Sequence, residues 1–303
     1  MLSAEKKAKG TAVALGYFDG IHLGHQAVLN TALEKAAEMK LTPAVMLFDI
    51  HPRKLLTGKV PPMLLSEERK RKLLKEMGFE IFEFDFRQAM NYSHEEFEEK
   101  VLLSQLNAKA VVCGYDYHYG KGGEGSPETL KNELTPKNIV VCSLSPVYLG
   151  DEAVSSTKIR HLINDGEIEK ANAMLGDYFT YDFTVEKGDG IGHKLGFPTI
   201  NQFFPEDFII PKYGVYASRV KIDGEYYSSV TNIGTRPTVS GESLRSETCI
   251  FDFEDDLYGK RVEVSLLKFL RSEKKFMSLD ELREAINKDI IKAKEIYKES
   301  EVK

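Results

Sequence analysis

A junction between an apolar run and an amphipathic stretch holds two histidines near the start of the chain. Residues 16–25 read GYFDGIHLGH, so His22 and His25 flank Gly24. The apolar residues 11–18 predict a buried strand, and residues 25–40 predict a helix. Backbone N–H groups at the start of a helix favour a phosphate there. Two imidazoles at that point could donate hydrogen bonds to a triphosphate as pyrophosphate departs.

Glycines in the same turn let a ligand approach the backbone closely. They are Gly16, Gly20 and Gly24. The first half has no P-loop lysine motif and this turn has no GxGxxG, which disfavours a P-loop kinase and a dinucleotide oxidoreductase. Two ordinary surface histidines beside a tight turn are the simpler alternative, and the flanking strand and helix argue against it.

Hydroxyl and basic side chains cluster again at residues 155–160, SSTKIR. Ser156 and Thr157 can cap a helix predicted over 156–175, while Lys158 and Arg160 place positive charge near its start. Cations are mildly unfavourable at that end of a helix, so a bound anion could compensate. An ordinary cap with solvated cations explains the pattern equally well.

The densest signal of the second half is GDGIGHKLGFPTIN at residues 188–201. Its glycines, among them Gly188, Gly190 and Gly192, form a loop that can fold over phosphates. Thr199 and Asn201 lie on the same side of an extended segment, and their oxygens suit Mg²⁺ shared with a nucleotide. A flexible hairpin loop followed by a strand is the alternative.

A carboxylate and a polar loop follow further along. Residues 232–238, NIGTRPT, predict a loop with polar atoms, and Glu247 begins a strand predicted over 247–253. Glu247 could accept the proton of a hydroxyl that attacks a phosphoryl group. The pattern alone favours an edge-strand glutamate that faces water. Residues 271–276 similarly favour a solvated loop.

Predicted strands and helices alternate in the first half, which indicates a doubly wound parallel sheet with ligands at the carboxyl ends of its strands. In the second half a hairpin turn at Asp223-Gly224 joins two strands. Two more strands and a capping box at 278–281 follow, which predicts a small antiparallel β barrel with a terminal helix. The change of pattern divides the chain into domains of residues 1–178 and 179–303.

Composition sets the protein class. The chain has 303 residues, 42% of them hydrophobic and 29% charged, with a net charge of −6. Wholesale disorder and nucleic-acid wrapping by bulk charge are therefore disfavoured. No apolar run has the roughly 18–20 residues of a membrane helix, and the start resembles no signal peptide. We expect a cytoplasmic protein with small-molecule substrates, no nucleic-acid or membrane partner, and room for a homo-oligomer.

Four motifs of the first half together resemble the nucleotidyltransferase half of bacterial bifunctional riboflavin kinase/FAD synthetases. They are GxFDGxHxGH at 16–25, FxxHP at 48–52, GxDYxYG at 114–120 and SSTxIR at 155–160. The resemblance implies a Rossmann-like domain that adenylylates FMN with ATP. It implies a set of site residues: for ATP, Gly16, Phe18, Asp19, Gly24, Ser156 and Thr157; for the triphosphate, His22, His25 and Arg160; for flavin, His51 and Asp116.

The second half resembles the riboflavin kinase domain of the same family. Its motifs are GFPTxN at 196–201, NIGTRPT at 232–238, DLYGK at 256–260 and RxExxF at 271–276. The resemblance implies a six-stranded kinase barrel with Glu247 as catalytic base. It further implies contacts to Mg²⁺ from Thr199 and Asn201, to ATP from Gly188, Gly190, Gly192 and Thr199, and to flavin from Asn232 and Arg236.

Three positions depart from the family pattern. Cys249 stands where a histidine is common, Ile50 replaces a proline, and Asp177 replaces an arginine. None of the three is assigned to the chemistry; they bear on the finer shape of the flavin pocket.

We therefore expect a transferase that phosphorylates riboflavin to FMN and then converts FMN to FAD, using ATP in both steps. Three alternatives remain open at this point. One is a nucleotidyltransferase for another acceptor, which leaves GFPTxN unexplained. Another is an enzyme with one active half. The third is a flavin-binding regulatory or carrier protein that turns over no ATP.

Overall fold

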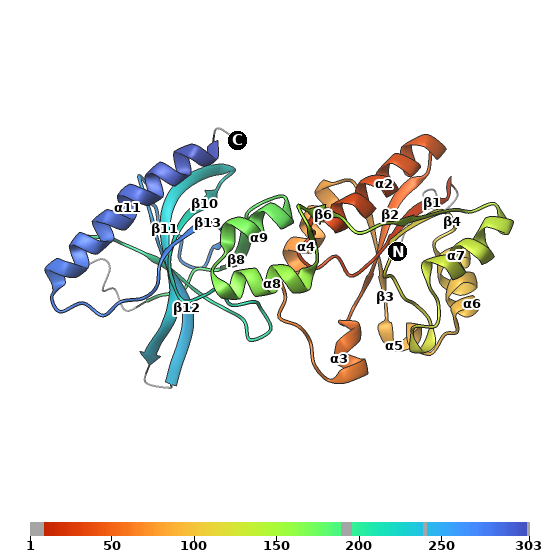
Figure 1. The fold of residues 1–303 in the computed structure, drawn as a ribbon, viewed down its shortest axis with the longest axis horizontal. Coiled ribbons are helices and arrows are strands. Elements are labelled where there is room, and N and C mark those ends of the chain that lie inside the picture. Colours follow the sequence, from red (N-terminus) through yellow and green to blue (C-terminus); the bar gives the residue numbers. More distant parts are fainter. Residues whose placement is uncertain (1–8, 189–195, 239–240, 302–303) are drawn as a thin grey trace. The chain divides into compact units, whose positions relative to one another are not determined.

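The computed structural model describes residues 9–188, 196–238 and 241–301, in two compact units (Figure 1). The first unit holds the chain up to Pro61 together with Glu67–Ser155, and the second holds Pro62–Ser66 and the chain from Ser156 onward. The domain boundary after residue 178 stays a prediction. Gly190 and Gly192 lie outside the described residues. No helix in the described ranges is long and apolar enough to cross a membrane.

A five-stranded parallel sheet forms the centre of the first unit, in the order β3-β2-β1-β4-β5. Every residue of the central strand β1 is buried, which explains its unbroken apolar sequence. The predicted parallel sheet is confirmed. The strands are β1 (Thr11–Leu15), β2 (Thr42–Phe48), β3 (Glu80–Phe84), β4 (Ala108–Gly114) and β5 (Val140–Leu144).

Helices cover both faces of this sheet, as a doubly wound fold requires (Figure 1). On one face α2 packs closely, because small residues such as Ala12, Ala36 and Ala110 meet there. On the other face Phe97 and Leu130 belong to a large apolar cluster. The helices are α2 (Leu23–Met39), α3 (Pro52–Thr57), α4 (Glu67–Glu76), α5 (Phe86–Ala89), α6 (His94–Phe97), the π-helix η1 (Glu98–Gln105), the 3-10 helices η2 (Lys121–Gly123) and η3 (Thr135–Lys137), and α7 (Pro127–Leu134).

The helix predicted over 156–175 is instead two helices, α8 (Ser156–Asp165) and α9 (Ile168–Leu175). Gly166 separates them with φ +79°, a left-handed conformation that ends a helix. A short antiparallel pair, β6 (Tyr148–Leu149) and β7 (Glu152–Ala153), precedes them and was not predicted.

The second unit is built on a six-stranded antiparallel sheet in the order β8-β13-β10-β11-β12-β9. The sheet curls into a nearly closed barrel. The Gln202 amide on the last strand donates to the Phe183 carbonyl on the first strand at 2.7 Å. The strands are β8 (Phe179–Thr184), β9 (Ile200–Phe203), β10 (Gly214–Ile222), β11 (Glu225–Thr238), β12 (Gly241–Ile250) and β13 (Arg261–Arg271).

The two faces of this barrel sheet differ in chemistry. Helix α11 (Leu279–Glu301) packs its Ala293 against an apolar cluster that includes Val215 and Cys249 (Figure 1). The side chains at alternate positions along the strands carry hydroxyls. Oγ of Ser218 lies 2.8 Å from Oγ1 of Thr231, and Oγ1 of Thr231 lies 2.8 Å from Oγ1 of Thr248. These buried hydroxyls satisfy one another. The predicted barrel with a terminal helix is confirmed.

Two strands are longer than predicted, and both changes matter for the site. Residues 232–238 continue β11 instead of forming a loop, because they pair in register with β12. Strand β12 starts at Gly241, well before Glu247. Since β12 lies between β11 and β9, Glu247 is on an interior strand, and the edge-strand interpretation is wrong.

Candidate active sites

The first candidate site is the turn between β1 and α2. Phe18 and Ile21 adopt left-handed conformations, with φ +56° and +43°. This turn folds the Phe18 ring back over Gly16, where a Cβ atom would lie only 3.0 Å from it. A Cβ on Gly24 would likewise lie 3.2 Å from the His22 imidazole. The glycines are therefore needed to seat two rings, and Asp19 is buried beside them.

His22 and His25 form a stacked pair at the start of α2. Their ring centroids are 3.7 Å apart and the rings are inclined by 15°. Nδ1 of His22 caps the helix by accepting the backbone N–H of His25 at 3.3 Å. That bond leaves Nε2 of His22 as its N–H donor when the ring is neutral.

Burial lowers the pKa of His25 well below its ordinary value, and the nearby His22 and Lys70 lower it further. At neutral pH His25 is therefore an uncharged imidazole. Its Nδ1 is buried and has no hydrogen-bond partner within the described ranges. The site can thus offer His25 to an anion as a neutral N–H donor, in line with the hydrogen bonds expected from the sequence.

A buried lysine supports this turn, and the sequence analysis missed it. Lys70 of α4 is only 2% exposed. Its ammonium lies 4.2 Å from the centroid of the Tyr17 ring, 3.3 Å from the Tyr17 carbonyl and 2.7 Å from Glu67. It lies in a run of charged residues, ERKRK, where no local signal marks it as buried.

The predicted flavin residues follow strands next to β1. His51 comes after β2, and its ring lies 4.2 Å from that of Tyr17, centroid to centroid. Asp116 is exposed and comes after β4. Because β1, β2 and β4 are parallel neighbours, Gly16, His51 and Asp116 emerge at one edge of the sheet. The strand order reverses direction there, which is where doubly wound folds bind ligands.

Three predicted ATP residues lie on α8, in the second compact unit. Ser156 and Thr157 open that helix, and Thr157 is exposed. Arg160 donates from Nε to the Pro62 carbonyl at 2.7 Å. The structure groups these residues with the second unit and the histidine pair with the first. Their action on one ATP stays a prediction.

The second candidate site crosses three adjacent strands of the barrel. Glu247 on β12 pairs in register with Asn201 on β9 at one side and with Asn232 on β11 at the other. Together with Thr199, these side chains line a cavity of about 750 Å³. Arg236 lies further along β11, opposite Ser243. The sequence analysis did not predict that β9, β11 and β12 are neighbours in the sheet.

Glu247 is open to the cavity and lies beside a buried guanidinium. Its side chain is 22% exposed, so it is accessible from the cavity. Its Oε1 lies 3.2 Å from Nε of Arg245, which is 5% exposed.

Asn201 is fixed by backbone contacts. Its carbonyl accepts the backbone N–H of Glu186 at 2.8 Å, and its Nδ2 lies 3.5 Å from the Thr199 carbonyl. A Cβ on Gly188 would overlap the Asn201 amide, so glycine is required there. Since the amide nitrogen of Asn201 is turned to Thr199, its amide oxygen is the atom that could bind a metal ion.

The opposite wall of the cavity comes from the segment before α11. The guanidinium of Arg271 binds Asp289 through two nitrogens, at 3.0 and 2.8 Å. Glu273 packs so closely on Gly234 that a Cβ there would overlap its carboxylate. The segment after Arg271 is a largely exposed loop, as the pattern favoured, but it is not merely solvated, since Arg271, Glu273 and Phe276 also line the cavity.

Cys249 also lines this cavity, two residues after Glu247. Burial raises the pKa of its thiol to about 11, so it is a neutral side chain at neutral pH. It supplies a small apolar surface in the place of a histidine.

Comparison with known proteins agrees with this two-part architecture. Residues 4–158 match the FAD synthetase family model, and residues 175–297 match the riboflavin kinase family model. The bifunctional riboflavin kinase/FMN adenylyltransferase of Bacillus subtilis is 36% identical, over 95% of this chain and 92% of the relative. The Escherichia coli (strain K12) protein of the same name is 34% identical, over 95% and 93%.

A solved structure has the same fold throughout. The crystal structure of a protein described as a macrolide-efflux protein from Streptococcus pneumoniae superposes with a TM-score of 0.83. It is 32% identical, and the match covers 92% of each chain. Sequence, fold and both family models thus agree over nearly the whole length, and the chain belongs to the family of bifunctional riboflavin kinase/FMN adenylyltransferases.

Proposed function

We propose that this protein phosphorylates riboflavin with ATP to give FMN, and then adenylylates FMN with a second ATP to give FAD and pyrophosphate. The observation that carries the proposal is the alignment of Asn201, Glu247 and Asn232 across three strands at one cavity. The histidine pair at the edge of the parallel sheet supports the second activity.

In the kinase step, Glu247 accepts the proton of the terminal ribityl hydroxyl of riboflavin. That oxygen attacks the γ-phosphorus of ATP, the bond to the bridging β,γ-oxygen breaks, and ADP leaves. Asn232, next to Glu247 on β11, is placed to orient the flavin at the carboxylate. Arg271 and Glu273 close the other side of the cavity.

The donors beside Glu247 fit Mg²⁺. The Thr199 hydroxyl and the Asn201 amide oxygen are hard oxygen ligands, the kind that this ion prefers. These two residues would hold it. When bound with ATP, Mg²⁺ supplies positive charge to the phosphates. Gly188 leaves room for the Asn201 amide, because a side chain at residue 188 would overlap it.

In the adenylylation step, a phosphate oxygen of FMN attacks the α-phosphorus of ATP, and the bond to the bridging α,β-oxygen breaks. The attacking oxygen is already ionised, so the step needs alignment and charge stabilisation more than a base. His22 and His25 donate hydrogen bonds to the departing pyrophosphate. Ser156, Thr157 and Arg160 add donors, while His51 and Asp116 contact the flavin.

One incubation tests the proposal. Purified protein is mixed with riboflavin, ATP and Mg²⁺, and the flavins are separated by chromatography over time. We expect FMN to appear first and then to convert into FAD. FMN without FAD would contradict the adenylylation half. Flavin binding without any product, also with FMN supplied, would overturn the proposal in favour of a carrier or regulatory protein.

A further inference from the structure

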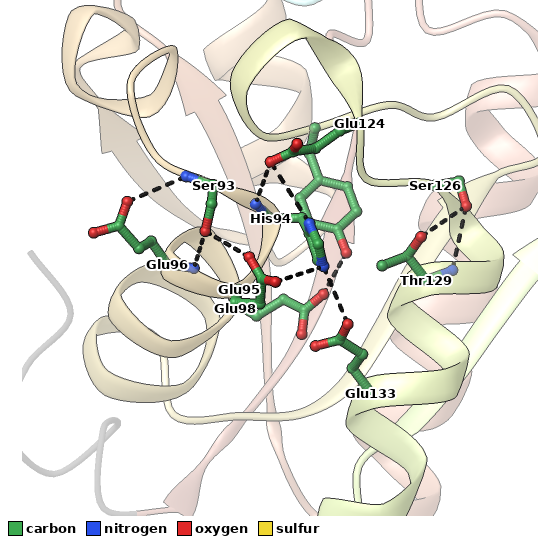
Figure 2. Close-up of polar contacts among 10 residues, drawn as sticks. Ser93, His94, Glu95, Glu96, Glu98, Glu124, Ser126, Thr129 and Glu133 are labelled. Atoms are coloured by element: carbon green, nitrogen blue, oxygen red, sulfur yellow. Dashed lines mark hydrogen bonds and ion pairs between the residues drawn. The ribbon is translucent and has the colours of Figure 1, made fainter.

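One imidazole in the first unit is surrounded by four carboxylates that neither candidate site uses (Figure 2). We call this group the His94 cluster: His94, Glu95, Glu98, Glu124 and Glu133. Nε2 of His94 lies 3.1 Å from a Glu133 oxygen and 3.2 Å from a Glu95 oxygen. Its Nδ1 lies 3.6 Å from a Glu124 oxygen. The cluster joins the start of α6 and η1, the turn before α7, and α7 itself.

Hydrogen bonds among the described residues do not satisfy this cluster. Nδ1 of His94 is buried without a hydrogen-bond partner there. Glu98 is 1% exposed; one of its oxygens accepts the Tyr119 hydroxyl, and the other is buried with no partner in the described part of the chain. Figure 2 shows the Glu98 carboxylate directed toward His94 and Glu133. A buried oxygen without a partner is costly unless a cation faces it.

The charge balance also requires a cation. Four carboxylates surround one imidazole, and a protonated His94 would supply a single positive charge. The carboxylates repel one another at this place, and a divalent ion would offset that repulsion.

Distances between the donor atoms suit one ion. His94, Glu95 and Glu124 each offer a ligand atom, and these atoms lie within 4.8 Å of one another. Two ligands of one zinc-like ion, each about 2.0–2.2 Å from it, lie about 3–3.5 Å apart. Nε2 of His94 lies 3.2 Å from Glu95, within this range, whereas Glu124 lies 3.6 Å from Nδ1, so its carboxylate has to turn toward Nε2 to share the ion.

The backbone around the cluster is built to bring Glu124 to His94. Tyr119 and Gly125 exchange two backbone hydrogen bonds, at 3.2 and 2.9 Å, which close the turn that carries Glu124. Gly120 has φ +75°, and a Cβ there would lie 2.9 Å from the backbone nitrogen of His94. The backbone N–H of His94 donates to Glu124 at 3.1 Å. The turn therefore presses directly on the start of α6.

We propose that the His94 cluster binds one divalent transition-metal ion of the Zn²⁺ type, with His94, Glu95 and Glu124 as ligands. A mixed nitrogen and oxygen donor set suits such an ion, whereas Mg²⁺ and Ca²⁺ prefer oxygen ligands alone. Glu98 and Glu133 face the ligands and complete the negative surroundings. The bound ion fastens the 119–125 turn to α6.

The test uses the full chain, freed of metal with a chelator and titrated with Zn²⁺ by calorimetry. Glu124→Gln removes a ligand but keeps an oxygen that can accept the His94 backbone N–H, so it should fold. Glu99→Gln is the matched control, because Glu99 lies on η1 next to Glu98 but pairs with Lys137 at 3.7 Å, outside the cluster. Other histidines and cysteines of the chain can bind Zn²⁺, so the comparison is between variants.

We expect the wild type and Glu99→Gln to bind one ion that Glu124→Gln binds at least about tenfold more weakly. Zn²⁺ should also raise the thermal midpoint of the wild type and of Glu99→Gln more than that of Glu124→Gln. His94→Asn should behave like Glu124→Gln. Equal affinity and equal thermal shifts in wild type and Glu124→Gln would overturn the proposal, as would a wild type that binds no Zn²⁺.

Discussion

The two candidate sites, for which we propose ATP as the common cosubstrate, present different chemical groups. The first presents the neutral imidazole of His25, stacked on His22, and backbone N–H groups at a helix start, with Lys70 buried nearby. The second presents a carboxylate between two amides on neighbouring strands. The difference follows from the nucleophile. A hydroxyl must lose a proton to attack phosphorus, so the kinase site needs a base. A phosphate is already ionised, so the transferase site needs only donors.

The sharpest test of this comparison is Glu247→Gln. The amide keeps the size of the side chain but cannot accept the hydroxyl proton, so FMN formation should fall by about 10²–10⁴-fold. FAD formation from supplied FMN should stay near the wild-type rate. Both rates are measured by chromatography of the flavins. An equal loss of the two activities would show that the sites are not independent.

His25→Ala should have the reverse effect. Loss of one donor to the leaving pyrophosphate should slow FAD formation by about 10²-fold, while riboflavin phosphorylation continues. Steady-state rates with FMN and with riboflavin as substrates separate the two outcomes. Unchanged FAD synthesis would remove His25 from the site.

Lys70→Met sharpens the comparison through a positioning residue. Without the ammonium over its ring, Tyr17 loses a fixed place, and FAD formation should fall by about tenfold with little change in FMN formation. Lys70→Arg should recover part of the rate. Lys75→Met, at an exposed position of the same helix, is the control. A similar loss in Lys75→Met would mean that the effect comes from α4 as a whole.

The smallest expected effect concerns acid stability. The folded state holds the pKa of His25 well below 6.5, so the unfolded chain binds a proton there first as the pH falls. This group therefore costs no stability above pH 6.5 and destabilises the fold progressively below it. Between pH 7.5 and 5.5, His25→Gln should lose less free energy of unfolding than the wild type in denaturant titrations. Equal losses would contradict a neutral, buried His25.

Much of the fold was predictable because periodicity reports burial. The nearly continuous apolar run at 11–18 contains the central strand β1, which ends at Leu15, and the Asp223-Gly224 turn joins β10 to β11 as expected. The break at Gly166 was not predictable, since the amphipathic pattern continues on both sides of it. The length of β12 also escaped prediction, because its first residues are polar and are held by pairing with β11.

For the sites, local motifs located the loops but not the partners that approach from elsewhere in the chain. Residues 188–201 indicated Thr199 and Asn201, and the structure places both at the cavity of Glu247. Arg271 and Asp289 are far apart in sequence, and only the packing of α11 brings them together. Lys70 has the composition of a surface residue, so its burial depends on the tertiary fold.

The closure of the barrel has a dynamic consequence. The five neighbouring strand pairs of the sheet share backbone ladders, whereas among the described residues β8 and β9 meet through the Gln202 amide and an isolated bridge between Asn201 and Glu186, just after β8. This seam is the line along which the barrel can part at the lowest free energy. Because Asn201 lies on the seam itself, parting there would move the proposed Mg²⁺ ligand without unfolding the sheet. Breathing of the barrel and exchange of nucleotide would then be one motion.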